Sequence, residues 1–151
     1  MSYLDVADRT WPLTRRVMGL HALAYRVTGG RIGHTLLGVP GQMLLLDHVG
    51  AKSAKKRTTP LLYFRDGGDV VIVASKGGFP KHPGWFHNLR ANPDTTVQIG
   101  SERRSVHARV ATPEERKRLW PKAVTTYHGY AGYQDRSRGR EIPLVILEPR
   151  G

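Results

Sequence analysis

The segment Thr58-Thr-Pro-Leu-Leu-Tyr-Phe-Arg-Asp-Gly-Gly-Asp-Val-Val-Ile-Val-Ala74 decides the fold class. It holds two apolar runs, 58–64 and 69–74, on either side of the turn Asp66-Gly67-Gly68. Such runs around an Asp-Gly turn are typical of a β-hairpin, because glycine adopts the positive φ angles that a tight turn between strands requires. The segment therefore predicts an antiparallel strand pair in the middle of the chain.

Further strands are expected on both sides of this hairpin. The apolar run 42–49 precedes it, and the runs 95–99 and 105–111 flank a second glycine-containing turn. The last run, 142–147, carries Pro143, which places it at a sheet edge or at the start of a strand. About six mostly antiparallel strands with peripheral helices predict an α+β protein built on a closed or nearly closed β-barrel, not a doubly wound sheet.

An N-terminal helix is expected over residues 11–28. Its apolar side chains recur at three- and four-residue spacing, which is typical of an amphipathic helix: Leu13, Val17, Leu20, Ala24 and Val27. We interpret it as a helix docked on the core through this stripe. A basic amphipathic helix that rests on an anionic membrane is the alternative.

Two more helices are expected after the central hairpin. A short one covers about 84–91 and ends before Asn92-Pro93, and another begins at the capping box Thr112-Pro-Glu-Glu115 and runs to about Tyr127. Its inward residues are expected to be Leu119, Trp120 and Val124. The stretch 127–134 also contains two glycines, which disfavour a helix and predict a mobile flap there.

Composition bounds the function. The 151 residues fit one domain, 1–151, which we divide into an N-terminal helix with its connector (1–38) and a barrel core (39–151). The 24 Lys and Arg against 12 Asp and Glu give a net charge of +12, which indicates an anionic partner: nucleic acid, a membrane surface, or a phosphorylated or polycarboxylate small molecule. The absence of cysteine excludes disulfides and iron–sulfur clusters. Without a membrane-spanning run or a signal peptide, we expect a cytoplasmic protein.

Two loops carry candidate binding residues. Gly50-Ala-Lys-Ser-Ala-Lys-Lys-Arg57 places four cations within six residues between two strands, so it is either a phosphate-binding loop or a solvated basic loop. It is not a P-loop, which has glycine directly before its lysine. Ala74-Ser75-Lys76-Gly77-Gly78 follows a strand directly, and Ser75 could hydrogen-bond a planar heterocycle or a reacting carbonyl.

Two aromatic segments complete the candidates. Trp85 and Asn88 share a helical face and could border a ligand, although core packing explains Trp85 equally well. Tyr127, Tyr130 and Tyr133 could line a pocket with apolar walls and hydroxyl groups. No metal-ligand spacing and no paired catalytic carboxylates are found in the sequence. This favours an enzyme whose cofactor supplies the reactivity, or a binding protein.

An ordered series of motifs runs through residues 40–149. It comprises Gly50-x-Lys52-Ser53, Thr59-Pro60-Leu61, Arg65-Asp-Gly-Gly68, Val73-Ala-Ser-Lys-Gly-Gly78, Pro83-x-Trp85-x-x-Asn88-Leu89-x-Ala91-Asn92-Pro93, Val97-Gln98-Ile99, Tyr127-x-x-Tyr130 and Arg140-x-Ile142-Pro143-Leu-Val-Ile146. In this order the series resembles the deazaflavin-dependent nitroreductase and quinone reductase family of actinobacteria. That family uses coenzyme F-420 and has a split β-barrel fold.

The resemblance implies a function and a site. The reaction would be hydride transfer from reduced coenzyme F-420 to a quinone, a nitroaromatic or an activated enone or lactone. Lys52, Arg57 and Lys76 would meet the phosphate and the oligoglutamate tail. The catalytic residues would be Ser75, Tyr127, Tyr130 and Tyr133. The coenzyme would be held by Ala51, Lys52, Ser53, Arg57, Thr58, Thr59, Pro60, Leu61, Leu62, Val73, Ala74, Ser75, Lys76, Gly84, Trp85, Phe86, His87, Asn88 and Tyr130.

The resemblance also implies that the N-terminal helix contacts the inner face of the cell membrane peripherally. Many relatives have arginine and glycine where this chain has Ala51 and Ala54, and alanine at 54 puts the path of the loop in question. A split-barrel protein that binds FMN or haem is the first alternative. A basic nucleic-acid-binding barrel is the second, although no nucleic acid is expected as a partner.

Overall fold

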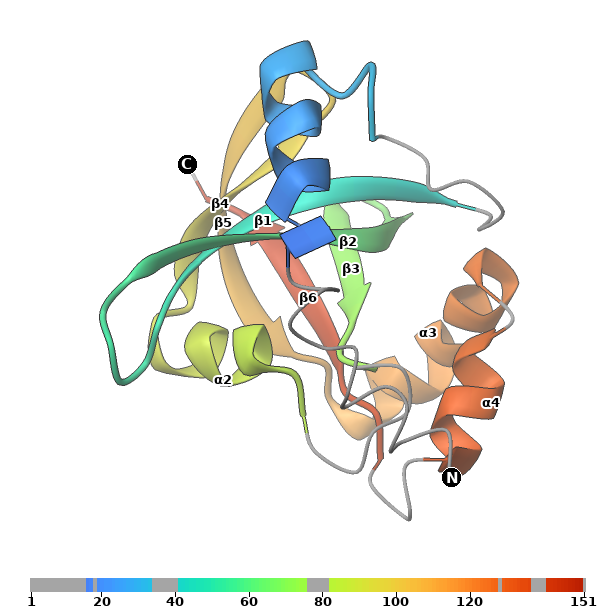
Figure 1. The fold of residues 1–151 in the computed structure, drawn as a ribbon. Coiled ribbons are helices and arrows are strands. Elements are labelled where there is room, and N and C mark those ends of the chain that lie inside the picture. Colours follow the sequence, from blue (N-terminus) through green and yellow to red (C-terminus); the bar gives the residue numbers. More distant parts are fainter. Residues whose placement is uncertain are drawn as a thin grey trace, which may run out of the picture.

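Hairpins build the barrel in this computed structural model, which describes residues 16–17, 19–33, 41–75, 82–127, 129–136 and 141–150. The strands are β1 (Gln42–Val49), β2 (Lys56–Asp66), β3 (Asp69–Val73), β4 (Asp94–Ile99), β5 (Glu102–Val110) and β6 (Leu144–Pro149). They close in the order β1-β2-β3-β6-β5-β4, and every pairing is antiparallel (Figure 1). The predicted α+β barrel is confirmed.

The central hairpin forms as predicted. Asp66 pairs with Asp69, and Gly67 between them has a φ of 60°, which glycine adopts without steric cost. Pro143 lies directly before β6, where its carbonyl accepts a hydrogen bond from the Ala74 N–H at 3.0 Å. A proline at this position costs no ladder hydrogen bond.

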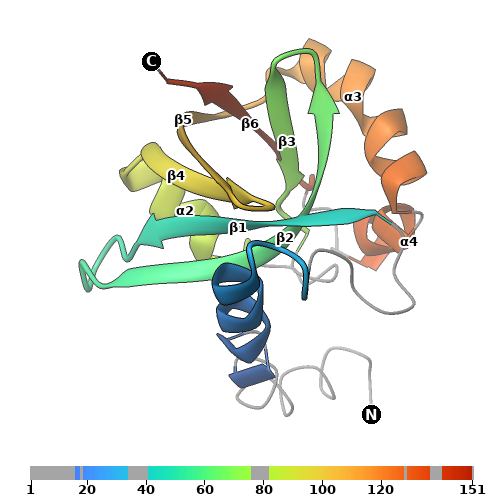
Figure 2. The same ribbon diagram turned by 90° about the horizontal axis from the view of Figure 1, so that it is seen from above.

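Alternation along the strands produces two apolar clusters. Side chains such as Leu44, Leu46 and Ile72 fill the barrel interior, together with Trp85, Phe86 and Leu89 of helix α2 (Gly84–Ala91). A second cluster on the outside joins β3 and β6 to helices α3 (Pro113–Thr126) and α4 (Gly129–Arg136). Figure 2 shows α2 and the α3–α4 pair on different sides of the barrel.

Helix α3 begins at the predicted capping box. The Thr112 side chain accepts a hydrogen bond from the Glu115 N–H, and the Glu115 carboxylate accepts one from the Thr112 N–H. Its buried residues are Leu119 and Ala123, whereas Trp120 and Val124, predicted to point inward, are only partly buried.

Residues 129–136 form α4, so the prediction that the two glycines in 127–134 disfavour a helix is wrong. Tertiary contacts offset the helix cost of its glycines. Tyr130 is 6% exposed in the outer cluster. The Gln134 Oε1 accepts hydrogen bonds from the Ile142 N–H and from the Arg116 guanidinium, which ties α4 to the chain before β6 and to α3.

Residues 19–28 form the N-terminal helix, which lies across the outside of the barrel (Figure 2). It docks through Ala22 and Tyr25 against Leu45. The Tyr25 hydroxyl donates to the Met43 carbonyl at 3.1 Å and accepts from the Gly100 N–H at 2.7 Å. None of the described helices combines the length and apolar character needed to cross a bilayer.

The expectation that this helix docks through its apolar stripe is wrong. Leu20 is 68% exposed and Val27 is 76% exposed, and Val17 and Leu23 are exposed as well. The face that docks presents Tyr25 and Arg26, whose polar atoms find partners on the barrel. A helical stripe identifies the apolar face, but hydrogen bonds and ion pairs on the opposite face decide the docking here. Leu13 lies outside the described residues.

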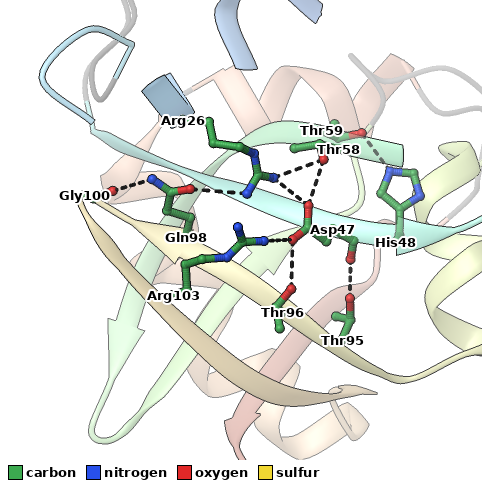
Figure 3. A network of polar contacts seen from close by, with 10 residues as sticks. All are labelled: Arg26, Asp47, His48, Thr58, Thr59, Thr95, Thr96, Gln98, Gly100 and Arg103. Carbon is green, nitrogen blue, oxygen red and sulfur yellow. Dashed lines mark hydrogen bonds and ion pairs between the residues drawn. The ribbon is translucent and has the colours of Figure 1, made fainter. Parts of the chain in front are cut away.

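Asp47 on β1 is the centre of the polar contacts under this helix (Figure 3). One carboxylate oxygen accepts from Arg26 and from the Thr58 hydroxyl, both at 2.7 Å. The other accepts from the Thr96 hydroxyl at 2.8 Å and from Arg103 at 3.1 Å. Burial alone would raise the pKa of Asp47, but the hydrogen bonds from Thr58 and Thr96 and the charge of Arg26 hold it below its usual value.

Candidate functional site

The loop at residues 50–55 forms the tip of the β1–β2 hairpin, which projects beyond the barrel (Figure 1). Two backbone hydrogen bonds close it: Gly50 N–H to the Lys55 carbonyl and Ala54 N–H to the Gly50 carbonyl, both 2.9 Å. Its cations Lys52, Lys55, Lys56 and Arg57 are exposed. No carboxylate in the described part of the chain forms an ion pair with them. The loop therefore offers four cations to an anionic ligand.

The backbone at Ala54 shows which path the loop takes with alanine at this position. It adopts a φ of 57° and is the only residue other than glycine with a positive φ among the described residues. A side chain in this left-handed region costs about 1–2 kcal/mol. The loop thus keeps the conformation that glycine would favour.

We expect Ala54→Gly to raise the free energy of unfolding by about 0.5–1 kcal/mol, because relief of the left-handed strain exceeds the added entropy of the unfolded chain. Denaturant unfolding measures the difference. Ala91→Gly in helix α2 is the matched control and should lower the same free energy. A loss of stability in Ala54→Gly would contradict the strain assigned to this position.

Helix α2 is joined to the loop through Asn88. The Ala51 N–H donates to the Asn88 Oδ1 at 2.9 Å, and the Asn88 amide nitrogen donates to the His48 Nδ1, also at 2.9 Å. The His48 Nε2 lies 2.9 Å from the Thr59 hydroxyl. These bonds bring together Ala51, Asn88 and Thr59, three of the residues predicted to hold a cofactor.

His48 was not predicted as a site residue. It follows Leu44 and Leu46 at every second position of β1, so strand alternation places it on the interior face, and it is 6% exposed. A histidine on the apolar face of a predicted strand, two residues before Gly50, was the available signal. Burial, and then the charge of Arg57, lower the pKa of His48 to about 4, while Asp47 acts in the opposite direction.

His48 predicts a pH dependence of stability. In the unfolded chain a histidine has a pKa of about 6.5, so between pH 6.5 and 4 the unfolded state binds a proton that the folded state does not. The stability linked to His48 is complete above pH 6.5 and falls by up to about 3 kcal/mol as the pH drops to 4.

Denaturant unfolding of the native protein and of His48→Asn at several pH values tests this expectation. The difference between the two free energies should change between pH 6.5 and 4, because the variant lacks this titration and the other groups cancel. Parallel pH curves would contradict a neutral buried His48.

The predicted residues of β2 are divided between its two faces. Leu61 packs against the interior cluster, and Thr59 reaches His48. Thr58 faces the N-terminal helix, where its hydroxyl is committed to Asp47, and Leu62 packs against the outer cluster. The side chains of this segment therefore cannot all point toward one ligand.

Ser75 lies just past the end of β3, which sits between α2 on one side and α4 on the other in both views (Figures 1 and 2). Val73 and Ala74 before it are buried. Trp85 and Phe86 are buried too, and their rings pack in the barrel interior, which agrees with the core-packing alternative for Trp85. Gly84 and His87 are exposed on α2. The end of β3 is thus flanked by two of the predicted segments.

The tyrosines lie on the α3–α4 side of this strand end. The rings of Tyr127 and Tyr130 meet edge to face, with centroids 5.1 Å apart. Tyr130 is buried in the outer cluster, and Tyr127 packs against it. Lys76 and the side chain of Tyr133 lie outside the described part of the structure.

A surface cavity of about 350 Å³ lies elsewhere, between β2 and α3. Its lining contains none of the predicted residues: Phe64, Arg65, Pro121, Lys122, Thr125 and Thr126. The candidate site is therefore defined by the loop, α2, the end of β3 and α4, and not by this cavity.

Comparison with known proteins identifies the family. A family model described as "F420H(2)-dependent quinone reductase" matches residues 17–149. The chain belongs to this family. An F420H(2)-dependent quinone reductase of Mycobacterium tuberculosis is 45% identical over 138 residues, which cover 89% of this chain and 91% of that protein. The resemblance noted in the sequence is confirmed.

Two solved structures extend the comparison. One, described as an F420-H2 dependent reductase, is 44% identical, covers 70% of this chain and 93% of its own, and has a TM-score of 0.64. The other, described as a domain-swapped dimer, is 38% identical, covers 94% of this chain and 98% of its own, and has a TM-score of 0.67. Both likenesses agree with the split-barrel prediction.

The cofactor of this quinone reductase family is coenzyme F-420, so the predicted cofactor class is confirmed. The residues present fit it. Its tail carries a phosphate and several carboxylates, and the exposed loop cations with no carboxylate partner in the described chain supply the complementary charge. Lys52 and Arg57 in this loop are the residues that the sequence resemblance predicts for the tail.

Proposed function

We propose that this chain transfers a hydride from reduced coenzyme F-420 to a quinone. The observation that carries this proposal is the cationic loop at residues 50–57, held against α2 by the hydrogen bond between the Ala51 N–H and Asn88. The family match supports it. When bound, the reduced deazaflavin supplies the hydride, and the protein positions the acceptor beside it.

The chain's own residues would divide the work. Lys52 and Arg57 bind the anionic tail, and Lys76 adds a third cation. Val73, Ala74 and Ser75 back the ring at the end of β3, where Ser75 offers a hydroxyl to a polar atom of the ring or acceptor. The edge-to-face pair Tyr127 and Tyr130 borders the acceptor, with Tyr133 beside it, and these aromatic side chains keep water from the reacting atoms.

Nitroaromatics and activated enones or lactones are proposed as further acceptors. Like a quinone, each has an electron-poor conjugated system that accepts a hydride. Aromatic walls such as Tyr127 and Tyr130 bind flat molecules of all three kinds without distinguishing them strongly.

Purified protein tests the proposed function directly. Titration with coenzyme F-420, followed by gel filtration and absorbance, should show coenzyme eluting with the protein, and menadione should then oxidise the reduced coenzyme. FMN, haem and a random oligonucleotide serve as the competing ligands. Absence of coenzyme binding together with tight FMN binding would overturn the proposal in favour of a flavin-binding split barrel.

Peripheral contact with an anionic membrane is proposed for the N-terminal helix. Val17, Leu20, Leu23 and Val27 form an exposed apolar face directed away from the barrel, and Arg16 and Arg31 are exposed near its two ends. Apolar side chains beside cations are typical of helices that lie in the interface of an anionic bilayer.

We expect the protein to sediment with vesicles that contain anionic lipid and not with neutral ones. The double variant Leu20→Gln/Val27→Gln should reduce the bound fraction about tenfold or more, because two exposed apolar side chains that would insert into the bilayer are lost. Leu119 and the rest of the core are untouched, so unfolding should be unchanged. Equal binding of the native protein and the variant would contradict this role of the helix.

A further inference from the structure

A chain of polar groups runs from the barrel interior to the cationic loop. It starts at the Thr59 hydroxyl on β2, passes through the His48 ring on β1 and the Asn88 amide on α2, and ends at the Ala51 N–H. Each of the three donor–acceptor distances is 2.9 Å. Figure 3 shows the His48 ring reaching Thr59.

The donors and acceptors in this chain fit one arrangement. The Ala51 N–H can only donate, so the Asn88 group facing it is the carbonyl oxygen, Oδ1. The other end of the amide is then the NH₂ group, which donates to His48, so the Nδ1 must be an unprotonated acceptor. The remaining ring proton is on Nε2, where it donates to Thr59.

The opposite orientation of the amide is unfavourable. If Asn88 turned over, its NH₂ group would face the Ala51 N–H, and two donors would oppose each other. The turned oxygen would face the His48 Nδ1, and the ring would then have to carry its proton on Nδ1 instead of Nε2.

We propose that His48 is a positioning residue of the coenzyme site: as an acceptor at Nδ1 it fixes the Asn88 amide, and Asn88 in turn fixes the backbone of the cationic loop at Ala51. The inference rests on the proposed function, because the loop and α2 are the segments assigned to the coenzyme. His48 itself lies behind Asn88 and need not touch the coenzyme.

The charged groups around His48 agree with a neutral ring. Asp47 comes from its own strand and points to the other face of β1, where Arg26, Arg103, Thr58 and Thr96 occupy both carboxylate oxygens. Arg57, paired with His48 in the register of β1 and β2, repels a proton on the ring. Helix α2 presents the uncharged Asn88.

Two substitutions separate the role of the Nδ1 acceptor from simple packing. His48→Leu fills the space but removes the acceptor. His48→Asn keeps a carbonyl oxygen at the position of Nδ1 and loses only the bond to Thr59. His107→Asn is the matched control, because His107 is an exposed histidine on β5 that takes no part in the site.

Coenzyme affinity is the first readout. We expect His48→Leu to raise the Kd and the KM for coenzyme F-420 about tenfold and to change kcat at saturating coenzyme less than twofold, since the site chemistry is intact. His48→Asn should restore the Kd to within about threefold of the native value, and His107→Asn should bind like the native protein. Native affinity in His48→Leu, or equal weakening in both His48 variants, would overturn the inference.

Two NMR readouts need no coenzyme and separate this inference from the proposed function. The ¹⁵N shifts of His48 in the native protein at pH 7 should report a proton on Nε2 and none on Nδ1. Hydrogen exchange of the Ala51 amide should accelerate in His48→Leu and return toward the native rate in His48→Asn. A proton on Nδ1 would overturn the inference even if His48→Leu did not fold. If coenzyme failed to bind while both NMR results held, the proposed function alone would be wrong.

Discussion

Asp47→Ala is expected to lower the free energy of unfolding by about 2–3 kcal/mol, because it removes the acceptor shared by Arg26, Arg103, Thr58 and Thr96. The Asp47 side chain is 25% exposed, so solvent screens the loss only in part. Two arginines are left without their counter-charge under the N-terminal helix. Denaturant unfolding at neutral pH measures the effect.

Two further variants define its origin. Asp47→Asn keeps the shape and part of the hydrogen bonding, and should therefore lose less stability than Asp47→Ala. Asp94→Ala removes an exposed carboxylate that pairs with His107 on the barrel surface, and should change the free energy of unfolding little.

Because the pKa of Asp47 is lowered in the folded protein, the stabilising charge of Asp47 is present above the unfolded pKa and lost as the pH falls through the folded pKa. Native protein and Asp47→Asn should thus converge in strong acid, and a constant difference would contradict the charge contribution.

Lys52→Ala is expected to raise the Kd for coenzyme F-420 between about tenfold and a hundredfold, because a charge-assisted contact to the anionic tail is lost. The side chain is exposed at the tip of the β1–β2 hairpin, so folding should be unaffected. Once coenzyme is saturating, kcat should be close to native. Steady-state kinetics with separate coenzyme titrations measure both quantities.

Substitutions at the other side of the site should show the reverse pattern. Ser75→Ala and Tyr130→Phe are expected to lower kcat more than they weaken coenzyme binding, since these hydroxyls are assigned to the ring and the acceptor and not to the tail. Lys117→Ala, an exposed lysine on α3, is the charge-matched control for Lys52. An unchanged Kd in Lys52→Ala would show that the tail is bound elsewhere.

The two hairpins, β2–β3 and β4–β5, could be predicted because their turns are local. The Asp66-Gly67-Gly68 turn and the alternating apolar residues around it depend only on neighbours in the chain, and the capping box of α3 is equally local. Closure through β1 and β4 depends on residues more than fifty positions apart, such as Leu45 and Gln98, and no local pattern encodes that pairing.

Predictions that depended on tertiary contacts were less successful. The glycines of α4 argued against a helix, but burial of Tyr130 and the hydrogen bonds of Gln134 outweigh their cost. The apolar stripe of the N-terminal helix gave no sign that Tyr25 and Arg26 on the other face would find partners. His48 escaped notice because its role depends on Asn88, forty residues away.

The N-terminal helix also bears on how the barrel is sealed. The β1–β4 pairing registers only Leu45 with Gln98 and Leu46 with Val97, fewer pairs than at any other junction of these six strands. Tyr25 bonds to Met43 on β1 and to Gly100 just after β4, and Arg26 bonds to Asp47 on β1 and to Gln98 on β4. The helix thus bridges β1 and β4 at the strand junction with the fewest paired residues. Hydrogen exchange of the backbone amides in the β1–β4 pairing should therefore accelerate whenever the N-terminal helix undocks from these strands.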